Sequence, residues 1–148
     1  MILTVLGVYF LIQLVLPLRH HFFKDDVLWT EEGHRLSWRM MLRSRGGRTS
    51  YKVVNTKTKD TTKINLNDYL TKKQQRRVGC YPDFIWQFAQ HLKKEYAQKG
   101  ENIQVFVENK VKVNQNPYQQ FVDPNVDLAN VPWKHFAHND WILPSPKE

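Results

Sequence analysis

The chain has 148 residues, of which 41% are hydrophobic and 13% aromatic, so one domain with its own core is expected. The single cysteine, Cys80, excludes a scaffold built on internal disulfides. Without a Cys-His spacing, it predicts a small buried side chain rather than a reactive thiol. The formal net charge of +8 is local: residues 19–80 carry 15 Lys and Arg against 6 Asp and Glu, whereas residues 81–148 carry 7 against 8. A uniformly basic surface is therefore excluded.

The first eighteen residues, "MILTVLGVYFLIQLVLPL", contain no charged side chain. At about 1.5 Å per residue they give a helix of roughly 27 Å, close to the hydrocarbon core of a bilayer. We predict a transmembrane helix over residues 1–18 that ends at Pro17, with "RHHFFK" (residues 19–24) as a collar at the lipid interface. A signal peptide and a soluble core helix are the alternatives, but a basic stretch before the apolar run and a small-residue cleavage site are both missing. Membrane lipid is thus an expected partner.

Residues 36–66 have the pattern of strands joined by polar turns. Apolar residues alternate with polar ones from Leu36 to Arg43, which predicts a half-buried strand with Leu36, Trp38, Met40 and Leu42 on one side. "RGGRTS" (45–50) is predicted to be a turn because of its glycines. "YKVV" (51–54) and "KINL" (63–66) are predicted strands around the polar segment 55–62. Together these segments predict a meander of three strands.

The second half of the chain combines helices, a strand and an irregular end. Residues 67–78 predict a short exposed helix, and residues 81–100 a longer amphipathic helix with Pro82 in its first turn and Gly100 at its end. Residues 102–114 alternate as a long strand, and residues 115–148 contain enough aromatic side chains for an ordered coil packed on the domain.

The predicted class is therefore α+β. One N-terminal transmembrane helix (1–18) precedes one extramembrane domain (19–148), in which an amphipathic helix covers an antiparallel sheet of about four strands.

Glu31, Glu32 and His34 form the candidate acid and base cluster, because carboxylates close to tryptophan and arginine often have shifted pKa values. The alternative is that Glu31 and Glu32 neutralise neighbouring arginines at the edge of the domain. No Ser-His-Asp spacing, glycine-rich phosphate loop, HExxH or CxxC motif is present.

Metal and nucleic acid are the other ligands that the sequence raises. Two sets of side chains are candidate metal ligands: His135, His138 and Asp140, and the pair His20 and His21. The first set lies in irregular chain and the second diverges at a helix end, so structural or solvated histidines are favoured. The arginines around Trp38 are explained more simply by anionic lipid next to a membrane span. Since no nucleic-acid-binding motif occurs, we expect no nucleic-acid partner.

Several distinctive stretches, taken in chain order after the terminal span, resemble one known family. They are "LWTEEGHRLSWRMMLRSR", "YPDFIWQFAQHLKKEY", "VFVENKVKVN", "QQFVDPNVDL" and "WILP". They are similar to the region after the helical bundle of the vitamin K-dependent γ-glutamyl carboxylase family, and most similar to its bacterial members. The resemblance covers residues 1 to about 144.

The resemblance implies a polytopic membrane enzyme that uses reduced vitamin K hydroquinone, O2 and CO2 to carboxylate glutamate side chains. The family's catalytic lysine and histidine lie upstream of the matched region, so we expect no catalytic residue and no cofactor bound by this chain alone. The chain would be a fragment or subunit that contributes the glutamate-binding domain. Its partners would be a glutamate-containing protein or peptide and the upstream helical bundle of the same enzyme. The missing basic residues before the span also favour a tail of something longer.

Carried over by position, the glutamate-binding wall would contain Gly33, His34, Trp38 and Arg43. Arg43 would bind a carboxylate through two parallel hydrogen bonds, and Trp38 would shield the reaction from water. The family places this domain on the lumenal or extracytoplasmic side, although the basic residues after the span favour the cytoplasm. The alternative function is a free-standing single-span membrane protein that binds a peptide or partner through Arg39 and Arg43 and catalyses nothing.

Overall fold

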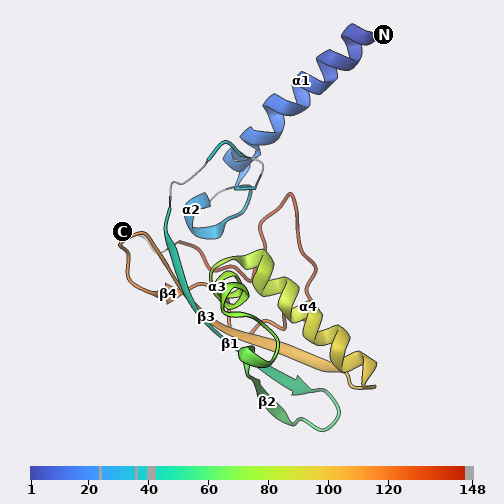
Figure 1. Ribbon diagram of the computed structural model, residues 1–148, viewed down its shortest axis with the longest axis vertical. Coiled ribbons are helices and arrows are strands. Elements are labelled where there is room, and N and C mark those ends of the chain that lie inside the picture. Colours follow the sequence, from blue (N-terminus) through green and yellow to red (C-terminus); the bar gives the residue numbers. More distant parts are fainter. Residues whose placement is uncertain (24, 36, 40–42, 146–148) are drawn as a thin grey trace.

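The computed structural model describes residues 1–23, 25–35, 37–39 and 43–145, and it has the predicted α+β class (Figure 1). The elements in chain order are α1 (Ile2–Leu18), η1 (Arg19–Phe22), α2 (Val27–Thr30), β1 (Arg45–Asn55), β2 (Thr61–Ile64), η2 (Leu66–Asp68), α3 (Lys72–Cys80), α4 (Pro82–Gln98), β3 (Ile103–Val113) and β4 (Gln119–Gln120).

The N-terminal helix α1 projects away from the rest of the molecule (Figure 1). Its side chains are almost all exposed, and Pro17 is its one buried residue. The segment Ile2–Phe22 is long and apolar enough to cross a membrane. A core helix of a soluble protein would bury such a surface, so the exposure of α1 favours association with a membrane over a place in the core.

The four-stranded sheet is antiparallel throughout, in the order β2-β1-β3-β4. β1 pairs with β3 along its whole length, from Arg45 opposite Val113 to Asn55 opposite Ile103. Since side chains alternate along a strand, odd-numbered residues such as Tyr51 and Val107 are buried on one face, and the even-numbered ones lie on the other face. The core therefore lies on one side of the sheet only.

The segment "RGGRTS" belongs to β1, so the predicted turn at residues 45–50 was wrong. Its glycines allow close packing instead of a turn. A Cβ atom on Gly47 would stand 1.7 Å from the carbonyl oxygen of Gly79 in α3, which means that this strand and this helix touch through their backbones.

The strand predicted at residues 36–43 is not formed in its described part. Residues 37 and 38 make a bend, because both the backbone N–H and the hydroxyl of Ser37 donate to the carbonyl oxygen of His34, at 3.2 and 2.5 Å. Leu36 and residues 40–42 lie outside the described residues. The sheet begins only at Arg45. β1 and β2 form a hairpin, and the described residues before Arg45 add no strand to it, so the predicted meander of three strands is not formed there.

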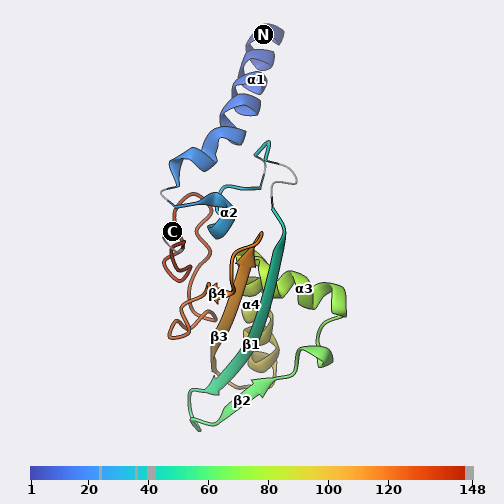
Figure 2. The same cartoon turned by 90° about the vertical axis from the view of Figure 1, so that its left-hand side faces the viewer.

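Two helices cover the buried face of the sheet; in Figure 2, α4 lies behind the strands and α3 lies beside β1. α3 begins at Lys72, later than predicted, with Thr71 and Gln74 forming a capping box. α4 confirms the predicted amphipathic helix, and Gly100 follows it with a φ of +78°. Its inner face packs on the sheet, where the rings of Phe88 and Tyr51 meet edge to face at 4.9 Å.

The described part of the C-terminal segment, up to residue 145, is an ordered coil packed on the domain, as predicted. Phe121 is fully buried, and its ring meets that of Trp29 edge to face at 5.3 Å. The indole N–H of Trp29 donates to the carbonyl oxygen of Leu143 at 2.8 Å, and Val122 forms a bridge with Ile142. The coil therefore closes the core between α2 and the sheet. Cys80 is buried, as predicted, and burial raises the pKa of its thiol.

Candidate functional site

A cavity of about 650 Å³ lies at the end of the domain that joins α1. This volume is in the usual range for small-ligand sites. The wall comes from η1 and the chain after it, the segment after α2, the α3–α4 junction and the C-terminal coil. The ionisable and aromatic residues of the lining are Arg19, Phe23, Glu31, Glu32, His34, Arg35, Arg43, Arg77, Tyr81, Asp83, Phe84, Trp86, Trp133, Lys134 and His135.

Gly33 brings the segment after α2 against the base of α1. Its φ is +70°, and a Cβ atom there would stand 2.9 Å from both the Cα of His20 and the ring of Phe23. Only glycine combines this left-handed backbone with such a close approach. Gly33 therefore fixes where the side chains of Glu31, Glu32 and His34 begin.

Glu31 ends α2 in the left-handed conformation and directs its carboxylate toward two arginines. Arg43 donates to both carboxylate oxygens through Nε and Nη2, and Nη1 of Arg45 lies 3.3 Å from Oε1. Burial raises the pKa of Glu31, while hydrogen bonding by Arg43 and the charge of Arg45 act in the opposite direction. This contact supports the structural account of Glu31, in which it neutralises neighbouring arginines.

Arg45 is held more tightly than any surface arginine would be. Its side chain is 1% exposed, and the guanidinium donates to the carbonyl oxygens of Leu28, Trp29 and Cys80 at 2.6, 2.8 and 3.0 Å. Burial lowers its pKa, and the charge of Glu31 opposes that shift. Arg45 therefore ties α2 and the end of α3 to the first residue of β1.

Glu32 points away from these arginines and binds the C-terminal coil. Its carboxylate, 3% exposed, accepts hydrogen bonds from the backbone N–H and side-chain amide of Asn139 at 2.7 and 3.0 Å. Nδ1 of His138 lies 2.6 Å from its other oxygen. Both adjacent glutamates are therefore occupied, so the contacts favour structural roles over a free acid or base pair.

His34 is a neutral ring beside a permanent cation. Its Nε2 lies 2.7 Å from Nη1 of Arg43, and because a guanidinium only donates, Nε2 must be the acceptor. Burial, followed by the charges of Arg43 and Arg39, lowers the pKa of His34 to about 4. His34 thus carries no charge near pH 7.

The cations of the cavity differ in how they are compensated. Arg35 is paired with Asp83, Arg43 with Glu31, and Lys134 with Asp140. Within the described part of the chain, Arg19 and Arg77 form no ion pair. Nη2 of Arg19 donates to the carbonyl oxygen of Arg35 at 2.9 Å, and the guanidinium carbon of Arg77 lies 5.7 Å from the ring centre of Tyr81. An arginine that faces a cavity over an aromatic ring and lacks a carboxylate partner is suited to bind an anion.

The structure brings together three of the four residues expected along the wall. Gly33, His34 and Arg43 line the cavity, whereas Trp38 is 71% exposed and lies outside its lining. Arg77 was not among the candidates. Its signal was the pair Arg76-Arg77 near the end of the shorter predicted helix (67–78), but only the turn between α3 and α4 directs one of the two toward the cavity.

The described residues contain no group of three or more His, Cys, Asp or Glu side chains that could hold a metal ion. His138 is bound to Glu32, Asp140 to Lys134, and Nδ1 of His20 lies 2.8 Å from the carbonyl oxygen of Pro17. These contacts support the structural account of the histidines.

A quinone with a long apolar tail also fits this cavity poorly. The wall carries five cationic and three anionic side chains, whereas a quinone requires mostly apolar walls.

The whole chain, residues 1–148, matches the family model described as the lumenal domain of vitamin K-dependent gamma-carboxylase. No curated protein and no solved structure matches it significantly.

Proposed function

Because the chain belongs to the family of the vitamin K-dependent gamma-carboxylase lumenal domain, we propose that its cavity binds a glutamate side chain of a protein or peptide substrate. The family and the exposed apolar helix together indicate a lumenal domain associated with a membrane. In the proposal, the chain is a fragment or subunit of a carboxylase-like membrane enzyme, and the domain presents the glutamate to chemistry performed elsewhere in that enzyme.

The charge of the cavity is the observation that carries the proposal. Five cationic side chains face three carboxylates across a volume large enough for a glutamate side chain and its flanking peptide. Of the five cavity cations, Arg19 and Arg77 have no carboxylate partner among the described residues. Because Arg19 already donates to the carbonyl oxygen of Arg35, the guanidinium of Arg77 is the proposed direct contact with the substrate carboxylate.

The remaining wall residues have supporting roles in this proposal. Glu31 already occupies the fork of Arg43, so Arg43 contributes its charge and the position of His34 instead of a direct two-bond contact. Tyr81, Phe84 and Trp86 supply apolar surface that excludes water around the bound side chain. Since the exposed Trp38 lies outside the lining, these rings replace it as the proposed shield.

The carboxylation chemistry itself is proposed for the complete enzyme. Reduced vitamin K, O2 and CO2 would supply the base and the carboxyl group there, and no step is assigned to them in this cavity, whose charged wall does not fit a quinone. A second candidate function is peptide or partner binding without catalysis. It is favoured by the contacts of Glu31 with Arg43 and of Glu32 with Asn139, which give both carboxylates structural roles in the wall.

The test measures peptide binding to the native membrane protein that contains this chain, reconstituted in nanodiscs of neutral lipid. A short end-blocked peptide with one glutamate is compared with its glutamine counterpart. We expect the glutamate peptide to bind more tightly, and Arg77→Ala to weaken it about 10-fold to 100-fold, the range for a hydrogen bond between charged groups. Arg76→Ala, on the neighbouring arginine outside the cavity lining, is the control and should bind normally.

Equal binding of the two peptides, or equal losses in the two arginine variants, would contradict the proposal. Incorporation of labelled CO2 into the bound peptide, dependent on reduced vitamin K, then separates the carboxylase-like function from binding alone.

A further inference from the structure

The uncovered face of the sheet carries a second concentration of positive charge. The helices lie on the other face, and Figure 2 shows the sheet in front of α4. The charged residues of the uncovered face are exposed and lie on three strands: Arg48, Lys52, Lys63, Glu108, Lys110 and Lys112. Five of these six are cationic, and we call this set the basic sheet face.

The register of the sheet places like charges directly opposite each other on this face. Arg48 lies opposite Lys110 across β1 and β3, and Lys52 lies opposite Lys63 across β1 and β2. Such pairs repel and destabilise a sheet by a few tenths of a kcal/mol or more each. None of these cations forms an ion pair with another residue in the described ranges. The two like-charged pairs therefore weaken the sheet, and no ion pair within the described ranges compensates them.

The upper part of the face is shaped as well as charged. A shallow hollow of about 500 Å³ lies over β1, β3 and β4, and Arg48, Ser50 and Lys110 are part of its wall. Beside it, the guanidinium carbon of Arg48 lies 4.8 Å and Nζ of Lys112 5.5 Å from the ring centre of Tyr118. The ring holds both cations in place next to the hollow.

A membrane does not fit this face. β2, with Lys63, lies at the end of the molecule opposite α1, and the strands run along the long axis between the two ends (Figure 1). A bilayer that contains α1 therefore cannot lie against the length of the sheet. The partner must approach from the side.

We propose that the basic sheet face binds an acidic stretch of extended polypeptide, belonging to the substrate whose glutamate enters the cavity. The substrate assignment rests on the proposed function. Phe106 of β3 lies opposite Lys52, and Lys112 follows six residues later on the same strand. At roughly 3.3 Å per residue this length is about 20 Å, so an acidic run of about six residues spans the face.

Charge and shape together favour a polypeptide over a nucleic acid. Four of the five cations are lysines on alternating strand positions, which match carboxylates on alternating positions of an extended chain. The ring of Tyr118 already holds two cations, so it is a poor platform for stacking a base.

The test uses two fluorescent, end-blocked peptides and the native protein in neutral-lipid nanodiscs. One peptide carries a single glutamate; the other carries the same glutamate, a flexible glycine-serine spacer and six aspartates. Lys52→Glu/Lys110→Glu reverses two charges of the basic sheet face. Lys73→Glu/Lys94→Glu, on exposed positions of α3 and α4, makes the same change in net charge elsewhere and is the matched control.

We expect the protein to bind the aspartate peptide at least 10-fold more tightly than the short one, with an affinity that falls as salt rises. The sheet variant should lose this advantage and bind the short peptide normally, and the control should keep it. Equal losses in both variants, or an RNA of equal charge that binds as tightly and responds to the same variant, would overturn the proposal.

If the short peptide does not bind, but the aspartate peptide still binds through the basic sheet face, the proposed function of the cavity would be refuted and the proposal for the sheet face would stand. A thermal midpoint equal to or above that of the parent would show that the sheet variant is folded, because each substitution removes a repulsive pair.

Discussion

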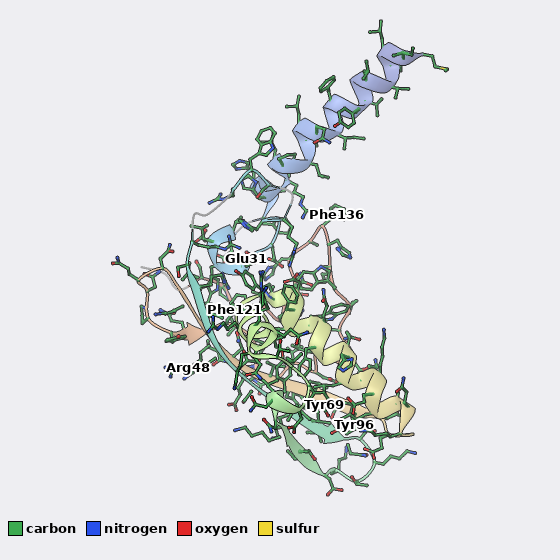
Figure 3. The ribbon with its side chains drawn as sticks, in the orientation of Figure 1. Glu31, Arg48, Tyr69, Tyr96, Phe121 and Phe136 are labelled. Carbon is green, nitrogen blue, oxygen red and sulfur yellow. The ribbon has the colours of Figure 1, made fainter. Side chains whose placement is uncertain are left out.

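Arg45 and Arg48 lie three residues apart on β1, yet they belong to opposite regions of the molecule. Arg45 is buried next to Glu31 of the cavity wall and is bound by that carboxylate and three carbonyl oxygens. Arg48 is exposed on the basic sheet face opposite another cation, and its ring partner is Tyr118. Figure 3 shows Glu31 close to α2 and Arg48 beside β4. One strand thus carries both a structural arginine and an arginine that the fold does not need.

The difference separates two uses of positive charge. A buried cation must be compensated inside the fold, because an unpaired one costs several kcal/mol. An exposed cation is solvated and is free to meet an external anion, at a small cost in repulsion. Substitutions on the two sides of β1 should therefore differ in sign as well as in size.

The largest effect is expected at Arg45. Arg45→Met leaves three carbonyl oxygens and part of Glu31 without their donor, so the free energy of unfolding should fall by about 3–5 kcal/mol. Denaturant unfolding followed by tryptophan fluorescence measures it. Arg48→Met is the matched control and should stay within about 0.5 kcal/mol of the parent. Similar losses of unfolding free energy in the two variants would contradict the distinction between a buried structural arginine and an exposed one.

A smaller loss is expected when the carboxylate that holds the C-terminal coil is removed. Glu32→Gln keeps the shape but weakens the acceptor for Asn139 and His138, so unfolding should become easier by about 1–3 kcal/mol. Limited proteolysis should cut the coil near residues 134–138 faster. Glu95→Gln, which removes only the exposed pair with Lys99, should have almost no effect.

His34 predicts a difference in the pH dependence of stability. Its pKa is lowered from 6.5 to about 4 in the folded protein, so the unfolded chain takes up the proton first as the pH falls. The contribution of neutral His34 is complete above pH 6.5 and is lost between pH 6.5 and about 4. His34→Gln should therefore lose less stability than the parent across this window in unfolding titrations. Parallel curves would show that the ring is not the neutral acceptor of Arg43.

The smallest effect has the opposite sign. Lys52→Glu replaces a repulsive pair with Lys63 by an attractive one, so the protein should gain about 0.2–1 kcal/mol while it loses affinity for an acidic peptide. Thermal unfolding and peptide titration on the same sample measure both. A loss of stability would mean that Lys52 has a structural partner.

Periodicity was sufficient for most of the fold but not for the stretch around the cavity. The helix α4 and the strand β3 follow from regular apolar spacing, because each buries one face of a single element. The glycines of β1 were interpreted as a turn, since nothing local shows that Gly47 touches the backbone of Gly79. Contacts of this kind depend on two elements at once.

The site was predicted in part for the same reason. The segment from Glu31 to His34 stands out by its composition, and the resemblance to a family directed attention to Gly33, His34 and Arg43, all of which line the cavity. Arg77 comes from the other side, across the α3–α4 junction. Arg77 and the segment at Gly33 line the same cavity only because the chain folds, so the spacing of these residues in the sequence does not predict that they lie together.

The most direct test of the central claim is to locate where a substrate glutamate lies. A short end-blocked peptide with one glutamate, and a photoreactive group on the next residue, is crosslinked to the native protein and mapped by mass spectrometry. We expect crosslinks to the cavity wall, at Tyr81, Phe84, Trp86 or Trp133, and their loss with the glutamine peptide or with Arg77→Ala. Crosslinks found only outside that wall, or equally strong for the glutamine peptide, would contradict a glutamate-binding cavity.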